Sequence, residues 1–253
     1  MIITYHGGYF VKISQGDTVI VANPFGKGSL RKPIRFGARV ALVSMDHPDM
    51  NGAENFSHGD KIPFVVSGPG EYEVGGIAIS GFLSPARSKS DAGGPQPVGD
   101  PPASDSGRAG KKLLNTIYAV ELEGIRLCFL GALSSPALSP EVIEGIGEVD
   151  VLFVPVSGGD VPARASTHAG GLLPADAEKI AVSLDAKLVI PLGWDEGGDP
   201  PASDFGRAGK QLKLFLKEAG AESTKPFDKL TLKKKDLEGK EGDVVVLEAL
   251  SHA

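Results

Sequence analysis

Cysteine is almost absent from this sequence of 253 residues, which contains only Cys128. A single cysteine excludes an internal disulfide and a zinc cluster that is held by several cysteines. Cys128 lies in the apolar segment 125–130, which is typical of a buried strand. We therefore expect a packed thiol there rather than a nucleophile.

Long apolar runs are also missing. No segment approaches the roughly 18 apolar residues that a membrane-spanning helix needs, and the first residues lack a basic region followed by an apolar one. We expect a cytoplasmic protein with no membrane partner. The net charge of −6 and the pI near 5.4 disfavour nucleic acid as a partner, because nucleic acid rewards a basic surface. The dense basic run 233–235 is interpreted as a solvated strand end.

What the sequence does contain is an apolar fraction of 41%, which is enough for one substantial core. Residues 1–253 are predicted to form a single domain. Short apolar segments cluster early and amphipathic segments come later, an order that favours two facing sheets flanked by helices. Strands are expected at 2–5, 9–14, 18–22, 63–67, 77–83, 116–122, 125–130, 150–156, 187–192, 230–232 and 243–247, and helices at 140–146, 174–184 and 211–219.

The segment 40–52 joins an apolar run to a polar turn that carries Asp46, His47 and Asp49. A buried strand that ends in this way delivers reactive side chains to the edge of a sheet. We expect His47 and Asp49 to be the centre of the functional site. They are the candidates for acid/base catalysis, and with Asp46 they are candidates for holding a metal.

This turn resembles the signature of the metallo-β-lactamase superfamily, Thr-His-x-His-x-Asp-His, in which a strand end supplies ligands for a pair of metal ions. On that pattern Ser44 takes the Thr position, Met45 and His47 the first two His positions, Asp49 the Asp position and Met50 the last His position. Two of the four ligands remain, because a neutral thioether is a poor substitute for imidazole around Zn²⁺ or Mn²⁺. The resemblance implies an α/β (α+β) fold, a four-layer αββα sandwich with two mixed sheets.

Nearly the whole chain is similar to the ascorbate-6-phosphate lactonase-like branch of this superfamily. Segments 7–9, 23–25 and 69–72 stand where that branch has Gly-His-Ser, Asp-Pro-Phe and Pro-Gly-Glu-Tyr. The resemblance places Gly8 at the His position of the first motif and Asn23 at the Asp position of the second. Both substitutions remove polar groups that would face the site.

The remaining ligand positions of the superfamily also carry other residues here. The resemblance places the metal-bridging Asp at Ala132, the last ligand His at Gly193, and another His within residues 84–90, which contain none. For Trp194 there are two alternatives: it covers the emptied position, or it is an ordinary residue at the edge of the core. For Glu71 the alternatives are that it faces the cleft or that it pairs on an exposed strand. The expected cleft is lined by Ser44, Met45, Met50, Glu71, Ala132, Gly193, Trp194 and Asp195.

His168, in the Gly-rich segment 157–171, is the best candidate for a relocated metal ligand or acid/base group. A Gly-rich loop after a strand can cradle an anionic group, although the spacing of a phosphate-binding loop is not present. The alternative is an ordinary surface histidine.

A string of twelve residues occurs twice, at 100–111 and at 199–210, with one substitution. Two copies are too few, and lie too far apart, for a solenoid. The segment 88–113 is rich in Ser, Asp, Gly and Pro and cannot bury enough apolar surface to offset its ordering entropy. We interpret 88–113 and 197–210 as inserted mobile loops, and the alternative is a matched pair of docking loops.

Two functions follow from these residues. In the first, the protein is a non-catalytic binding or assembly module that retains a site for a small polar ligand and needs no cofactor. In the second, it is a lactonase or phosphoester hydrolase with one Zn or Mn ion in a rebuilt site around His47 and Asp49. The first is favoured, because a cation ionises water at neutral pH only when several anionic or imidazole ligands hold it. Both remain compatible with a homo-oligomer.

Overall fold

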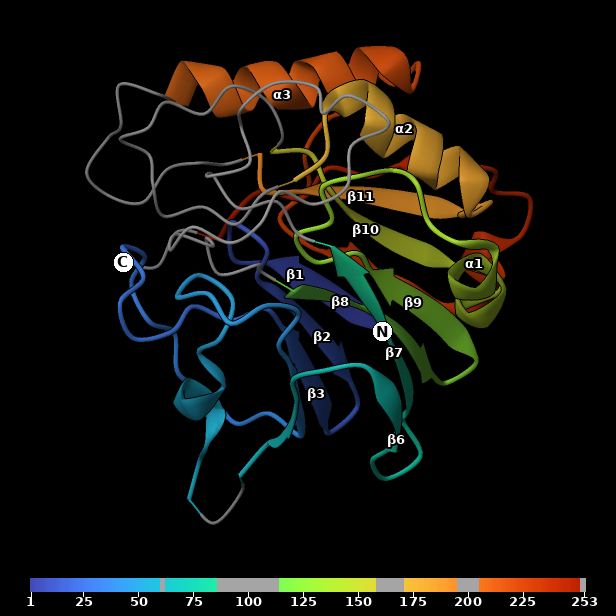
Figure 1. Ribbon diagram of the computed structural model, residues 1–253. Coiled ribbons are helices and arrows are strands. Elements are labelled where there is room, and N and C mark those ends of the chain that lie inside the picture. Colours follow the sequence, from blue (N-terminus) through green and yellow to red (C-terminus); the bar gives the residue numbers. More distant parts are fainter. Residues whose placement is uncertain (60–61, 86–113, 158–170, 195–204, 251–253) are drawn as a thin grey trace, which may run out of the picture.

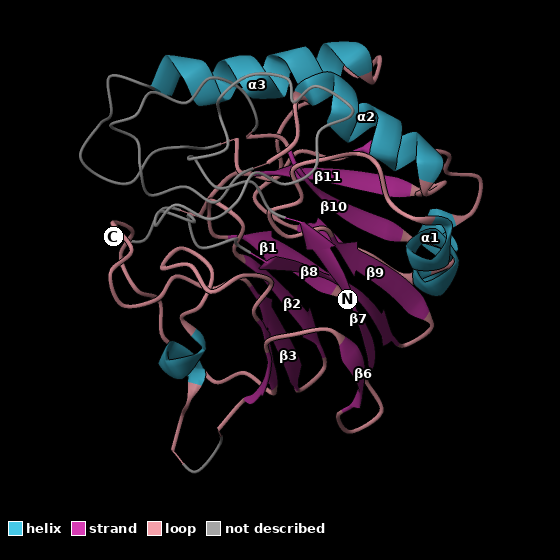
Figure 2. Ribbon diagram, viewed as in Figure 1, coloured by secondary structure: helices cyan, strands magenta, loops and turns pink. Residues whose placement is uncertain are grey.

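The computed structural model describes residues 1–59, 62–85, 114–157, 171–194 and 205–250 (Figure 1). Within this part of the chain, two β-sheets face each other, and helices cover the outer face of one of them (Figure 2). Apolar side chains from both sheets fill the space between them. The predicted sandwich of two mixed sheets is therefore confirmed.

The first sheet has the strand order β12-β1-β2-β3-β4-β5. Strands β1 to β3 form an antiparallel meander, whereas β3, β4 and β5 run parallel. The three residues of β4 are buried, so the polar turn after this strand begins at the sheet edge. The strands are β1 (Ile2–Tyr5), β2 (Val11–Gln15), β3 (Thr18–Ala22), β4 (Val40–Leu42), β5 (Phe64–Val66) and β12 (Leu230–Thr231).

The second sheet has the order β13-β11-β10-β9-β8-β7-β6, and its strands β9, β10, β11 and β13 are parallel. All residues of β10 and β11 are buried, as expected for strands that are covered on both faces. The carboxyl ends of parallel strands meet at one edge, so the segments after β9, β10 and β11 gather there. The strands are β6 (Gly70–Glu73), β7 (Ala78–Pro85), β8 (Leu114–Leu122), β9 (Ile125–Phe129), β10 (Val151–Pro155), β11 (Leu188–Leu192) and β13 (Asp243–Val244).

Three helices, α1 (Pro140–Ile146), α2 (Pro174–Ser183) and α3 (Phe205–Glu218), pack on the outer face of the second sheet. The α1 helix begins where expected, because the Ser139 hydroxyl caps the Val142 N–H and Pro140 fills the first turn. The outer layer on the first sheet is thin. It consists of the short helix η1 (Ala53–Phe56) and the loop between β3 and β4, whose phenylalanines pack on the sheet.

The α3 helix differs from the expected 211–219, because it begins at Phe205. The second copy of the twelve-residue repeat therefore supplies its first turns. Glycine and proline in the repeat favour a loop, but Phe215 and Leu216 further along the helix are buried against the second sheet. Tertiary packing of this apolar face stabilises the helix and overrides local propensity.

Several strand boundaries also differ from the prediction. The second strand begins at Val11 rather than at residue 9, because the Phe10 N–H donates to Gly7 O and holds Tyr9 in a turn. The last strand ends at Val244, and beyond it Leu247 makes only an isolated bridge to Phe227. Strand β6 had no predicted range, but it agrees with the alternative in which Glu71 pairs on an exposed strand.

Cys128 is a free, fully buried thiol in β9. Burial raises its pKa to about 12, so the reactive thiolate is not populated at neutral pH. The predicted packed thiol is confirmed.

Tyr118 of β8 joins the two sheets next to the polar turn. Its buried hydroxyl lies 3.0 Å from Val43 O and 3.2 Å from Val66 O, at the ends of β4 and β5. Burial raises the pKa of this phenol, so it remains a hydrogen-bond donor. Tyr118 thus holds the end of β4, where the polar turn begins, against the second sheet.

Tyr118→Phe is expected to lower the free energy of unfolding by about 1–2 kcal/mol, because two buried carbonyl groups lose their shared donor. Urea unfolding measures this. The matched control is Tyr72→Phe, since the Tyr72 hydroxyl makes two longer bonds, of 3.2 and 3.3 Å, near the surface. The control should change stability by less than about 0.5 kcal/mol, and equal losses in the two variants would contradict the account.

Candidate functional site

The polar turn 44–52, called the signature turn below, is held rigidly by backbone contacts. The Ser44 N–H donates to the Asn23 side-chain oxygen at 2.9 Å, and the Ser44 carbonyl accepts from the Thr116 N–H at 2.8 Å. On its other side the turn binds the β3–β4 loop, where the Gly26 N–H donates to Pro48 O at 2.7 Å. The turn is therefore tied to both sheets and to the neighbouring loop.

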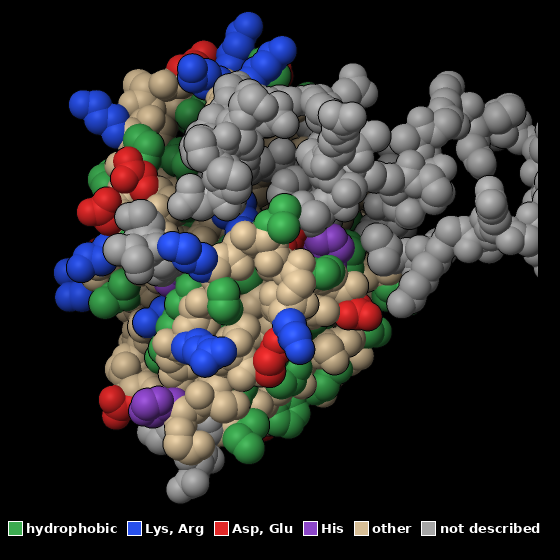
Figure 3. Space-filling model, turned by 90° about the vertical axis from the view of Figure 1, so that its left-hand side faces the viewer, with side chains coloured by type: hydrophobic (Ala, Val, Ile, Leu, Met, Phe, Trp, Pro, Cys, Tyr) green, Lys and Arg blue, Asp and Glu red, His purple; other side chains and the backbone are tan. Residues whose placement is uncertain are grey.

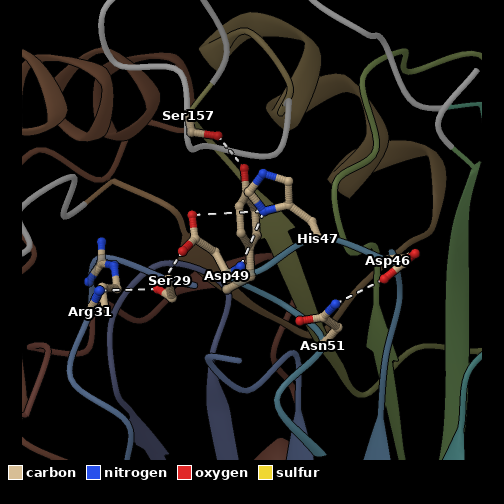
Figure 4. A network of polar contacts seen from close by, with 8 residues as sticks. Ser29, Arg31, Asp46, His47, Asp49, Asn51 and Ser157 are labelled. Carbon is tan, nitrogen blue, oxygen red and sulfur yellow. Dashed lines mark hydrogen bonds and ion pairs between the residues drawn. The ribbon is translucent and has the colours of Figure 1, made fainter. Parts of the chain in front are cut away.

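His47 and Asp49 face each other within this turn (Figure 4). His47 Nδ1 lies 3.2 Å from the Asp49 N–H, which donates to it, and 3.8 Å from Asp49 Oδ2. A ring nitrogen that accepts a hydrogen bond carries no proton. His47 Nδ1 therefore faces both the backbone N–H and the carboxylate of Asp49.

Asp49 is further held by the β3–β4 loop. The Ser29 hydroxyl donates to Asp49 Oδ1 at 2.5 Å, and the Asp49 side chain is only 8% exposed. Asp46 has a different environment, because it is exposed and accepts a hydrogen bond from Asn51 Nδ2 at 2.9 Å. The structure thus brings His47 and Asp49 together with Ser29, and it pairs Asp46 with Asn51 at the surface.

The two methionines of the signature turn are core residues. Met45 is 2% exposed and Met50 is fully buried, and both belong to the cluster between the sheets. A buried thioether surrounded by hydrocarbon gains packing energy and offers no lone pair to a hard cation. These positions therefore contribute to stability and not to a donor set.

Ala132, at the position of the bridging Asp, is fully buried. The Asn115 side chain fixes the backbone here, since its Oδ1 accepts from the Ala132 N–H at 2.8 Å and its Nδ2 donates to Leu130 O at 2.9 Å. A Cβ added to Gly131 would lie 2.4 Å from Asn115 Oδ1 and 2.6 Å from Ser44 Cβ. The segment after β9 therefore packs directly on the signature turn.

Gly193, at the position of the last ligand His, is enclosed by other side chains. Its N–H donates to Gly8 O at 2.7 Å, and an added Cβ would lie 3.2 Å from Ser157 Cβ and 3.3 Å from Tyr9 Cε1. The Tyr9 and Ser157 hydroxyls are hydrogen-bonded at 2.5 Å and buried. Tyr9 and Ser157 thus occupy the space into which a side chain at residue 193 would extend.

The other expected residues lie apart or outside the described part of the chain. Trp194 is half-buried, packs against apolar residues on both faces of the second sheet and lies 6.0 Å from the Tyr5 ring. Glu71 is exposed on β6, where it accepts a hydrogen bond from Ser80 at 2.7 Å. His168 and Asp195 fall outside the described residues.

Sequence reasoning did not single out Tyr9, Ser29, Asn115 or Ser157 as parts of this site. Tyr9 and Ser157 are 148 residues apart, so no local pattern relates them. Only the topology could have indicated this contact, because Tyr9 and Ser157 lie in segments that reach the same sheet edge as His47.

The donor set does not fit a pair of metal ions. Across the described ranges, no group of three His, Cys, Asp or Glu side chains is placed to hold a cation. At the superfamily's ligand positions in the described residues, His47 and Asp49 carry ligand side chains, and His47 Nδ1 already accepts the Asp49 N–H. Met45, Met50, Ala132 and Gly193 supply packing at the other positions.

The family model described as the beta-lactamase superfamily domain matches residues 2–193. The chain belongs to the metallo-β-lactamase superfamily. Among solved structures, a Thermotoga maritima protein described as a Zn-dependent hydrolase of this superfamily shares 25% identity, with a TM-score of 0.64 and 97% of each chain covered. The fold of this chain thus agrees with that of the Thermotoga maritima protein over nearly the full length of both chains.

Two further structures resemble the superfamily member in fold. A Parabacteroides distasonis protein described as a metal-dependent hydrolase has 14% identity and a TM-score of 0.56, with 98% of this chain and 93% of that chain covered. A Veillonella parvula protein with the same description has 13% identity and a TM-score of 0.58, with 92% of this chain and 99% of that chain covered. A search of curated proteins found no match. None of the helices in the described ranges has the length and apolarity to cross a membrane.

Proposed function

We propose that this superfamily member is a non-catalytic binding or assembly module that recognises a small polar ligand at the signature turn. The observation that carries the proposal is the packing at the lost ligand positions. Met45 and Met50 lie in the core, Ala132 is fully buried, and Tyr9 and Ser157 fill the space beside Gly193.

The physical argument concerns how a hydrolase makes its nucleophile. A bound cation lowers the pKa of water toward neutrality, and the protein must supply several imidazole or carboxylate ligands to hold that cation. His47 and Asp49, two residues apart on one turn, cannot enclose a cation by themselves. The fold therefore retains the position of the site without the full set of imidazole and carboxylate ligands that would hold a cation.

The resemblance to the ascorbate-6-phosphate lactonase-like branch belongs to the same proposal. The Gly-Gly-Tyr, Asn-Pro-Phe and Pro-Gly-Glu-Tyr segments support it. The net charge of −6 supports a small-molecule ligand rather than nucleic acid or an anionic membrane. A cytoplasmic location is part of the proposal. A homo-oligomer is compatible with this role.

A second function is favoured by the His47–Asp49 geometry. The 3.8 Å separation of Nδ1 and Oδ2, with the His47 side chain 18% exposed, suits an acid/base pair. In that case the protein would be a lactonase or phosphoester hydrolase in which these residues hold one Zn or Mn ion, and the ion when bound would supply the activated water. His47 and Asp49 would then share the ion with residues from elsewhere in the chain.

Thermal unfolding with added Zn²⁺ or Mn²⁺ separates the two functions. A metal at one hundred times its dissociation constant stabilises a protein by about 2.7 kcal/mol, which raises the Tm of a chain of this size by about 5–11 °C. We expect a shift below about 1 °C, equal in the wild type and in His47→Ala. A larger shift that disappears in His47→Ala, together with metal-dependent hydrolysis of lactones or phosphoesters, would establish the second function.

A further inference from the structure

The β3–β4 loop, residues 23–39, is strongly basic in an acidic protein. No acidic residue occurs between Asp17 and Asp46, whereas the whole chain has a net charge of −6. Figure 3 shows the side of the molecule that lies at the left in Figure 1, and Lys, Arg and His side chains lie on it together with some acidic ones. The loop thus creates a local positive field beside the signature turn. Its basic residues are Lys27, Arg31, Lys32, Arg35 and Arg39.

Arg31 is the member of this loop that reaches the site. A Cβ added to Gly8 would lie 3.6 Å from Arg31 Nε and 3.7 Å from Arg31 Cζ. The guanidinium therefore lies against Gly8, and it stacks over the Phe25 ring with its carbon 5.2 Å from the ring centre. Gly8 in turn accepts the Gly193 N–H, and Gly193 stands at the position of the last ligand His.

The backbone of Arg31 is coupled to the signature turn by a short relay. The Arg31 N–H donates to the Ser29 hydroxyl at 3.1 Å, and that hydroxyl donates to Asp49 Oδ1. In Figure 4, Asp49 lies between Arg31 and His47, and its two oxygens face Ser29 and His47. The chain thus places a permanent cation and an imidazole on either side of one buried carboxylate.

We propose that Arg31 binds the oxyanion of a small ligand beside the signature turn, a carboxylate or a phosphate. This inference rests on the proposed binding function and names its ligand class. Guanidinium keeps its charge at all physiological pH values and presents a planar fork that matches both oxyanions. In this protein the Arg31 guanidinium would supply the positive charge that metal ions supply in the superfamily.

The test measures binding of inorganic phosphate and of succinate, with glycerol as the uncharged probe. Trp194 is the single tryptophan and directly follows Gly193, so its fluorescence reports on the site. The variants are Arg31→Gln, which removes the charge, and Arg31→Lys, which keeps the charge but not the fork. Arg35→Gln is the matched control, because it removes an exposed cation from the same loop. Circular dichroism confirms that each variant is folded.

We expect at least one anion to bind the wild type and Arg35→Gln with similar affinity. Arg31→Gln should weaken this binding at least tenfold, and Arg31→Lys should weaken it by an intermediate factor. Binding of only one of the two anions would identify the source of the oxyanion. Unchanged binding in Arg31→Gln, or no binding of either anion, would overturn the inference.

The outcomes also distinguish this inference from the proposed function. Glycerol binding as tight as anion binding would overturn the role of Arg31 and leave a binding module in place. Metal-dependent turnover would overturn the proposed function, whereas the comparison of Arg31→Gln with Arg35→Gln would still decide whether Arg31 binds the oxyanion.

Discussion

Gly52→Ala is expected to lower the free energy of unfolding by about 3 kcal/mol or more. A Cβ at this position would lie 1.9 Å from Phe25 O and 2.2 Å from Phe25 C. The backbone cannot withdraw, because the Gly52 N–H donates to Pro24 O at 2.9 Å. The substitution therefore separates the end of the signature turn from the β3–β4 loop. Urea unfolding followed by circular dichroism measures the loss.

Gly68→Ala is the matched control for this substitution. No heavy atom lies within 4 Å of an added Cβ at Gly68, and its φ is not in the left-handed region. We expect a change of less than about 0.5 kcal/mol. If Gly52→Ala were equally mild, the signature turn would not be packed on the loop as described.

Asp150→Ala is expected to cost about 2–3 kcal/mol of stability, because it leaves two lysines and one N–H without their acceptor. Asp150 is 3% exposed, and its oxygens lie 2.8 Å from Lys187 Nζ and 2.6 Å from Lys234 Nζ. It also accepts the Arg126 N–H at 2.9 Å. The carboxylate thus connects β9, the beginning of β11 and the C-terminal segment that contains Lys234. Partial exposure of the two lysines limits the cost.

The same carboxylate makes stability depend on pH. Burial alone would raise the Asp150 pKa, but the hydrogen bonds from Lys187, Lys234 and the Arg126 N–H together lower it below 3.8. A carboxyl whose pKa is lower in the folded state stabilises the protein above its unfolded pKa, and this contribution is lost as the pH falls through the folded pKa. The stability difference between wild type and Asp150→Asn should therefore be largest at neutral pH and shrink near pH 3.

Urea unfolding at neutral pH and near pH 3 measures this dependence. Comparing the wild type with Asp150→Asn removes the contributions of all other carboxylates, since both proteins share them. A difference that stays constant between the two pH values would show that Asp150 is not the ionised acceptor of these lysines.

The order of the strands could be predicted from the sequence, because buried strands such as β10 and β11 are continuous apolar runs. Boundaries were less predictable where buried side chains lie in turns. Tyr9 and Phe10 are buried like strand residues, but the Phe10 N–H closes a turn on Gly7. The start of α3 depends on packing against α2 and the second sheet, which its local sequence does not encode.

The candidate site was predictable only in its local part. His47 and Asp49 follow the buried strand β4, so their approach to each other is a property of one turn. The contact of Tyr9 with Ser157, in contrast, depends on how the two sheets meet. Arg31 was missed because the cations of its loop are spaced out, whereas the denser run 233–235 attracted attention.

The central proposal is that the superfamily scaffold has kept the position of its metal site and lost the ligands. Elemental analysis of the protein purified without chelators tests this most directly. We expect zinc, manganese and iron far below one ion per chain, with no change in His47→Ala. One tightly held ion per chain that is lost in His47→Ala would contradict the account.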